Sequence, residues 1–157
     1  MKENEIINSL SNWIKEYFKK SNLLVANEVS IQLGEEIQDM KTDLIAIQSK
    51  SNIIHAFEIK NKCHESNINS IVWQVDSLYG NYKWLVTDEN SQNNIPLELF
   101  EKKGLGLIIF KSNNLNTINL SKFEIILHAK YVDGNLLNYY PSLMETWNNQ
   151  KKKHASK

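Results

Sequence analysis

Hydrophobic residues recur along this chain with two periods, one typical of helices and one typical of strands. Between Glu5 and Lys19, and again between Ile68 and Tyr79, they recur at three- and four-residue spacing, which predicts two amphipathic helices. Shorter segments rich in β-branched and aromatic residues are bounded by turn-forming residues and predict strands. These segments are Leu23–Leu33, Thr42–Gln48, Ile53–Lys60, Tyr82–Thr87, Leu105–Phe110 and Phe123–His128.

The segment between residues 82 and 110 indicates how two of these strands are connected. Pro96–Lys103 has proline at its beginning and Gly104 just past its end, as helix chemistry prefers. A strand, a helix and a strand in succession form a crossover, which joins parallel strands. Leu105–Phe110 is an almost continuous apolar run, which suits a strand buried on both faces. The pattern therefore predicts an α/β fold with a mixed β-sheet flanked by helices on both faces.

The remaining segments set the expected boundaries. At 157 residues the chain is most simply one domain, which we assign to residues 1–150. Residues 151–157 are a basic C-terminal tail that we expect to be disordered. Leu136–Trp147 predicts a weak helix interrupted at Pro141, and the polar sequence GEEIQD at residues 34–39 predicts a turn or loop.

Two of the predicted strands flank the polar group Ser49–Asn52, which predicts a hairpin loop. If Gln48 opposes Ile53 across this loop, the two residue numbers of every opposed pair add up to the same value. Asp43 then faces Glu58. Directly opposed side chains in a strand pair have Cβ atoms only about 4.5–5.5 Å apart.

Lys60 emerges two residues after Glu58 and therefore on the same face of its strand. The opposite face of the hairpin carries Leu44, Ala46, His55, Phe57 and Ile59. An E-x-K pair taken alone is most often a solvated surface salt bridge. Here both faces are largely apolar, and charged side chains in such a setting are costly unless they are paired or bound to a metal. Two opposed carboxylates should repel unless a cation sits between them.

This arrangement, an aspartate at the start of one strand and E-x-K at the end of the next, resembles the PD-(D/E)XK nuclease superfamily with its restriction-endonuclease-like fold. Asp43 matches the motif aspartate, Glu58 the second acid and Lys60 the lysine; Thr42 stands where a proline is usual. The resemblance implies that Asp43, Glu58 and the backbone carbonyl of Ile59 hold Mg²⁺ or Mn²⁺. It also implies that Lys60 positions a water or stabilises developing negative charge.

In one branch of this superfamily, a helix after the lysine strand carries a glutamine followed four positions later by a tyrosine. Gln74 matches the glutamine, whereas Tyr79 falls five positions on. The resemblance therefore implies a supporting catalytic role for Gln74, although a glutamine at the margin of an amphipathic helix is more often simply exposed. A glutamate of the first helix often joins the metal site in the superfamily; Glu3 and Glu5 are both candidates, and the choice stays open.

Charge and cysteine content narrow the setting. Eighteen basic and eighteen acidic residues cancel, so any nucleic-acid surface must be a local patch or be completed by a second subunit. Cys63 is the only cysteine, which excludes an internal disulfide and favours a cytoplasmic location, and its neighbour His64 is far short of completing a metal site. The sequence contains no run of about eighteen apolar residues, so no membrane segment is predicted. Tyr131, Tyr139, Tyr140 and Trp147 suit the core or a dimer interface better than base stacking.

Together these features predict a divalent-metal-dependent nuclease that hydrolyses phosphodiester bonds, with DNA favoured over RNA as the substrate. Defence or restriction, and junction or repair processing, both fit a compact domain that works as a homodimer or with a partner protein. The main alternative is a catalytically inactive nuclease-fold protein that acts as a nucleic-acid-binding or assembly subunit. A third interpretation is that the hairpin register is wrong and the charges are surface pairs.

Overall fold

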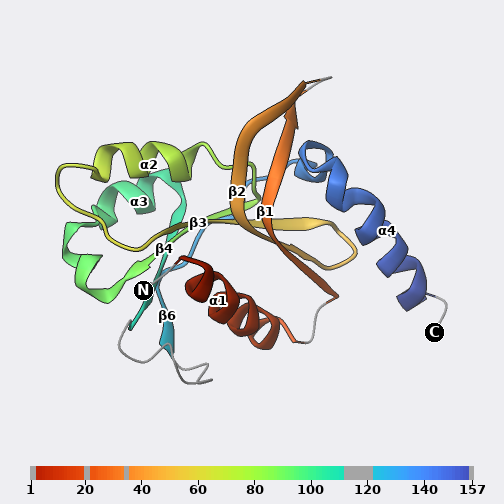
Figure 1. Cartoon of the computed structure of the whole chain (residues 1–157), viewed down its shortest axis with the longest axis horizontal. Coiled ribbons are helices and arrows are strands. Elements are labelled where there is room, and N and C mark those ends of the chain that lie inside the picture. Colours follow the sequence, from red (N-terminus) through yellow and green to blue (C-terminus); the bar gives the residue numbers. More distant parts are fainter. Residues whose placement is uncertain (1–2, 20–21, 34–35, 112–121, 156–157) are drawn as a thin grey trace.

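The chain folds around a six-stranded sheet whose strands lie side by side in sequence order, from β1 to β6 (Figure 1). The computed structural model describes residues 3–19, 22–33, 36–111 and 122–155. Its strands are β1 (Leu23–Leu33), β2 (Glu36–Gln48), β3 (Ile53–Lys60), β4 (Tyr82–Asp88), β5 (Leu105–Phe110) and β6 (Phe123–Leu127). Its α-helices are α1 (Glu3–Tyr17), α2 (Ile68–Asp76), α3 (Leu97–Lys103) and α4 (Pro141–Ala155), and η1 (Glu89–Asn94) and η4 (Leu136–Tyr139) are 3₁₀ turns.

The sheet is mixed, as the sequence predicts. Strand β2 is antiparallel to both of its neighbours, β1 and β3; β3, β4 and β5 are parallel, and β6 returns antiparallel to β5. Helices α2 and α3 make the crossovers that parallel strands need. Helix α3 ends at Gly104, whose φ of 73° is a left-handed conformation that glycine adopts without steric cost.

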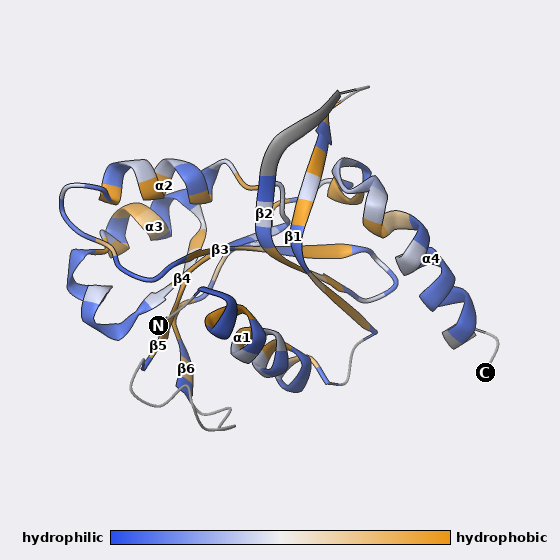
Figure 2. Cartoon of the chain, in the orientation of Figure 1, coloured by the Kyte–Doolittle hydropathy of each residue, from blue (hydrophilic) through white to orange (hydrophobic). Residues whose placement is uncertain are grey.

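Helices cover both faces of this sheet (Figure 1). Helix α1 packs Ile6, Leu10 and Ile14 onto one face, against a cluster that includes Leu44 and Phe57. On the opposite face, α2 and α3 cover the β4–β5 side. Helix α4 and η4 cover the β1–β3 side of that same face. Hydrophilic residues dominate the C-terminal half of α4 in Figure 2, and one of them, Gln150, donates through Nε2 to the Leu23 carbonyl of β1 at 2.8 Å. The predicted α/β architecture with helices on both faces is confirmed.

The register predicted for the β2–β3 hairpin is also confirmed, because Gln48 pairs with Ile53 and Ile45 with Ala56. Both faces of the hairpin are buried. Leu44, Ala46, Phe57 and Ile59 face α1, whereas Ile45, Ile47, Ile54 and Ala56 face α4. Ser49 and Asn52 close the loop with φ angles of 65° and 57°. Charges carried on this hairpin beyond its loop therefore lie within an apolar framework.

Three expectations about segment boundaries are wrong. The GEEIQD segment is not a loop after residue 35, because Glu36–Gln48 forms one strand whose first residues pair with β1 through Leu33–Glu36 and Gln32–Ile37; residues 34 and 35 lie outside the described residues. The basic tail is helical through Ala155, as the continuation of α4. Pro141 begins this helix instead of interrupting it, since proline suits the first helical position.

Tyr140 and Trp147 belong to the core, because both are fully buried. The Tyr140 hydroxyl donates to the Tyr79 carbonyl at 2.6 Å, and Trp147 Nε1 donates to Asn52 Oδ1 at 2.6 Å. The first bond fastens the end of η4 to the segment that follows α2, and the second fastens α4 to the loop of the hairpin. In the part of the chain that the structure describes, no helix is long and apolar enough to cross a membrane.

Candidate active site

Strands β2 and β3 separate near the acids that the motif identifies. Their ladder ends with the pair Leu44–Phe57, one step before Asp43 and Glu58 would oppose each other. Beyond this pair a side chain replaces the backbone partner of β3. Asp43 Oδ2 accepts a hydrogen bond from the Ile59 amide at 2.8 Å. Strand β3 continues alongside β4 as far as the pair Lys60–Thr87. The two motif strands thus part on one side of β3 while β3 itself stays firmly held on the other.

The direction of the Ile59 carbonyl follows from the alternation of β3. The amide and the carbonyl of one strand residue point to the same neighbouring strand, and successive residues alternate between neighbours. Ile54 shows the β4 side, since its amide donates to Asn81 Oδ1 at 2.9 Å and its carbonyl accepts the Asn81 amide at 2.8 Å. Ile59, an odd number of residues further on, faces β2 with both groups. Its carbonyl therefore opens toward the Asp43 side, where the strands have parted.

Glu58 is the most strongly perturbed acid of the site. Its side chain is only 14% exposed, and its Oε1 lies 3.4 Å from Lys60 Nζ. Burial first, and then the negative charge of Asp43, raise the pKa of Glu58 to about 7, and Lys60 offsets this only in part. At neutral pH the carboxylate is thus poised between its charged and neutral forms, so a cation placed beside it would be strongly favoured.

Asp43 has a raised pKa as well. Burial is the main cause, the hydrogen bond from the Ile59 amide opposes it, and the negative charge of Glu3 at the start of α1 adds to it. Glu3 also acts on Glu58, so the first helix begins within electrostatic reach of both acids. Within residues 3–19, 22–33, 36–111 and 122–155, however, three or more His, Cys, Asp or Glu side chains nowhere gather closely enough to hold a metal. Glu3 therefore shapes the field of the site without completing a three-acid cluster.

Gln74, on α2, shares a cleft of about 290 Å³ with Glu58. Its Nε2 lies 3.5 Å from Ser70 Oγ, a weak contact. Its Oε1 is buried and lacks a hydrogen-bond partner among the described residues. Gln74 thus lines the same cleft as Glu58, and its buried Oε1 has no donor among the described residues. Such a group is costly unless a ligand or water supplies the missing hydrogen.

The other walls of this cleft were not predicted as part of the site. They are Ile31, Lys41, Thr42, Trp73, Ser77 and Leu78. Trp73 carried the one signal that the sequence offered, because it is a large aromatic residue next to Gln74 and outside the apolar stripe of its helix. The others meet only because β1 and β2 lie across from α2, a long-range arrangement that local pattern does not encode.

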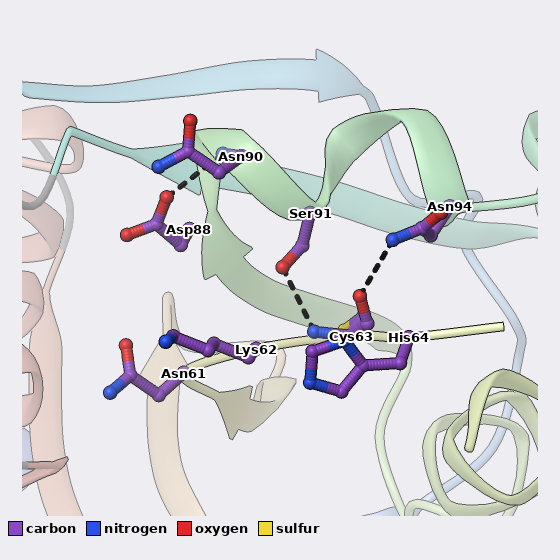
Figure 3. A pocket seen from close by; sticks show the side chains of 8 residues that line it. All are labelled: Asn61, Lys62, Cys63, His64, Asp88, Asn90, Ser91 and Asn94. Atoms are coloured by element: carbon purple, nitrogen blue, oxygen red, sulfur yellow. Dashed lines mark hydrogen bonds between the residues drawn. The ribbon is translucent and has the colours of Figure 1, made fainter. Parts of the chain in front are cut away.

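A second, polar pocket of about 490 Å³ lies just beyond Lys60, where the chain leaves β3 and β4 (Figure 3). Figure 3 shows residues 61–64 facing residues 88–94 across it. Ser91 Oγ accepts the Cys63 amide at 2.9 Å, and Asn94 Nδ2 donates to the Cys63 carbonyl at 2.9 Å. Cys63 is itself buried while His64 is exposed, so the two neighbours do not form a metal pair. These bonds hold the loop that follows the lysine strand.

Comparison with known proteins shows a similarity of fold only. No protein-family model matches the sequence, and no curated protein matches it. Among solved structures, a protein of unknown function from Silicibacter pomeroyi is similar, with a TM-score of 0.53 and 14% identity over 94% of this chain and 82% of that one. At this identity the similarity shows a shared fold alone.

Two weaker similarities involve cyanobacterial proteins. An XisH family protein from Nostoc punctiforme gives a TM-score of 0.45 with 11% identity, over 78% of this chain and 99% of that one. An fdxN element excision controlling factor protein from Anabaena variabilis gives 0.41 with 12% identity, over 69% of this chain and 94% of that one. Function must therefore be argued from the site itself.

Proposed function

We propose that this chain is a divalent-metal-dependent nuclease of the PD-(D/E)XK type that hydrolyses phosphodiester bonds of DNA, in defence or in repair. One observation carries the proposal. Asp43, Glu58 and Lys60 come together where β2 and β3 part, with Asp43 bonded to the Ile59 amide and Glu58 ion-paired to Lys60. A solvated surface salt bridge would not bury its acid or raise the pKa of that acid to about 7.

The donor set fits Mg²⁺ or Mn²⁺. Two carboxylates and a backbone carbonyl, those of Asp43, Glu58 and Ile59, are the hard oxygen ligands that these ions prefer. Each acid has a pKa raised by burial, and Glu58 also by the charge of Asp43, which is the electrostatic strain that a cation relieves. When bound, the ion would polarise the scissile phosphate and lower the pKa of the attacking water.

The chain's own residues would then divide the remaining work. Lys60 carries a positive charge within 3.4 Å of Glu58 and would stabilise the negative charge that develops on the phosphate. Gln74 lines the same cleft, and its Oε1, which has no donor among the described residues, would take a hydrogen bond from the attacking water and so orient it. The partial burial of the two acids lowers the local dielectric and so strengthens each of these interactions.

Calorimetry with Mn²⁺ tests the metal site directly. The wild-type protein should bind Mn²⁺, Asp43→Asn and Glu58→Gln should abolish binding, and Glu124→Gln, which changes an exposed acid on β6, should leave it intact. Single-stranded, duplex and branched DNA and RNA, incubated with Mn²⁺, then show which phosphodiester is cleaved. Unchanged Mn²⁺ binding by both site variants would overturn the proposal.

A second function has an observation in its favour. The described residues supply two acids at the site and no three-acid group, and Glu58 is partly protonated at neutral pH in the absence of a cation. We therefore keep the alternative of a nuclease-fold protein that binds nucleic acid, or assembles with a partner, without cleaving. Nucleic-acid binding that proceeds equally well with a chelator present, together with no cleavage of any substrate, would select this alternative.

A further inference from the structure

Trp73 is unlike the other tryptophans of this chain. Its side chain is 64% exposed, whereas Trp84 and Trp147 are buried and Trp13 is half-buried against α1 neighbours. It lies on α2, whose residues Ile71, Val72 and Val75 form the buried side of the helix. A single exposed aromatic residue means little by itself. Its position decides what it means.

That position is the rim of the candidate catalytic cleft. Trp73 lines the same 290 Å³ space as Glu58 and Gln74, so the lining includes an acid and an amide. Ile31 and Leu78 give the remaining walls apolar surface, and Lys41, an exposed cation on β2, lies on the cleft as well. A lining that combines an indole ring, apolar side chains, polar groups and a lysine suits a flat heterocycle joined to a phosphate.

We infer that Trp73 stacks on an unpaired nucleobase whose phosphate lies near Lys41 at the same cleft, so that the substrate class is nucleic acid with unpaired nucleotides. This inference rests on the proposed function in so far as it places nucleic acid in the cleft. In a duplex both faces of each base are already stacked within the helix, whereas an unpaired base offers a face to an aromatic side chain. The cleft volume is at the lower end of the range for small-ligand sites and suits one base.

The charge of the chain points the same way. Proteins that bind duplex through phosphates alone depend on many basic contacts, and this chain has a formal net charge of zero. Binding of single strands also uses basic groups along the backbone, and base stacking adds to affinity beyond that charge contribution. A neutral protein with an exposed indole at its candidate active site is therefore better suited to unpaired bases than to intact duplex.

The test measures binding without cleavage. The full-length protein, in buffer with a chelator, is titrated with a fluorescein-labelled single-stranded oligonucleotide and with the matching duplex, and both anisotropy and tryptophan emission are recorded. Trp73→Ala should weaken single-strand binding by about tenfold or more and duplex binding by less than about twofold. Trp73→Phe should recover most of the affinity while the quenching of tryptophan emission disappears.

Tyr131→Ala is the matched control, because Tyr131 is another exposed aromatic residue and does not line the cleft. It should bind like wild type. Equal affinity of wild type and Trp73→Ala for single strands, an equal loss on single strands and duplex, or no binding of either would overturn the inference. A change of oligomeric state in Trp73→Ala with unchanged oligonucleotide affinity would overturn it in favour of a protein interface. Failure to cleave any substrate with Mn²⁺, together with Trp73-dependent single-strand binding, would reject the nuclease and leave the stacking role standing.

Discussion

The two ends of strand β3 differ in whether their polar groups have partners within the protein. From Ile53 to Phe57 the strand pairs with β2, and its buried polar groups have partners. From Glu58 to Lys60 it has lost β2, its acid has a pKa of about 7, and the nearby Gln74 Oε1 has no hydrogen-bond partner among the described residues. One continuous strand thus passes from a fully satisfied core to a set of groups that a ligand would satisfy.

His55 illustrates how complete the satisfied end is. Burial lowers the pKa of His55 to about 3, so the ring is neutral. Trp84 Nε1 can only donate, so His55 Nδ1 accepts its hydrogen at 3.2 Å. Nε2 then carries the ring proton and donates to Gln48 Oε1 at 3.0 Å. Both nitrogens of a buried histidine are matched, which gives it a structural and not a catalytic role.

The largest expected effect lies at the open end of the strand. Asp43→Ala or Lys60→Ala should lower the cleavage rate by roughly 10³-fold or more, because Asp43 would hold the metal ion and Lys60 would stabilise the negative charge that develops on the phosphate. Thermal unfolding should show that both variants remain folded, since neither residue is part of the three buried apolar clusters. Cleavage of the best substrate under single-turnover conditions measures the effect. Variants that cleave at the wild-type rate would show that the charges at this end of β3 have no chemical role.

The next effect belongs to the closed end. Asn81 Oδ1 accepts the Ile54 amide, and its Nδ2 donates to the carbonyls of Val132 and Gly134 at 2.8 and 3.0 Å. Asn81→Ala should lower the free energy of unfolding by about 3 kcal/mol, because it leaves a buried amide and two carbonyls unmatched. Urea denaturation measures this, with Asn12→Ala on the exposed side of α1 as a control that should change stability by less than about 0.5 kcal/mol.

The pH dependence of stability separates the two ends further. The folded-state pKa of Glu58 is raised from 4.5 to about 7, so the folded protein binds this proton more tightly than the unfolded chain does. The metal-free protein should therefore lose stability as pH rises from 4.5 to about 7, by on the order of 2 kcal/mol. Glu58→Gln should abolish this loss and be more stable than wild type above pH 7.

Adding Mn²⁺ should restore stability to the wild-type protein at high pH and have no effect on Glu58→Gln. Urea denaturation at several pH values, with and without the ion, gives the comparison. A wild-type profile that coincides with that of Glu58→Gln would show that Glu58 is not perturbed by its surroundings.

The sequence was sufficient where structure depends on local pattern. The hairpin register follows from alternation and loop length, and the crossover before Leu105–Phe110 follows from the succession of strand, helix and strand. The predicted opposition of Asp43 and Glu58 lies one pair beyond Leu44–Phe57, the last pair of the ladder. The first part of β2 was missed because its polar residues gain their strand structure from pairing with β1. The bond from the Ile59 amide to Asp43 was missed because it depends on where the ladder stops.

The cleft could not be predicted from the sequence, because its walls come from distant parts of the chain. Trp73 and Thr42 lie 31 residues apart in the sequence and meet only when α2 has packed beside the β1–β2 pair. Gln74 was identified through a resemblance, and no periodicity distinguishes a glutamine that faces a cleft from one that faces solvent. Sequence reasoning therefore located the charged residues of the site but not the surface that would select a substrate.

The smallest expected effect concerns Gln74 and bears directly on the contrast between the two ends. Gln74→Ala should lower the cleavage rate by about tenfold, the lower range for one positioned polar group, because the attacking water loses a hydrogen-bond acceptor. Its stability should be unchanged or slightly higher, since Oε1 has no hydrogen-bond partner among the described residues. Asn81→Ala is the opposite case, with stability lost at the closed end of β3 and the cleft residues untouched. If Gln74→Ala instead lost stability and cleaved normally, the unmatched oxygen would have a structural partner, and the cleft would not be the place where this chain meets its substrate.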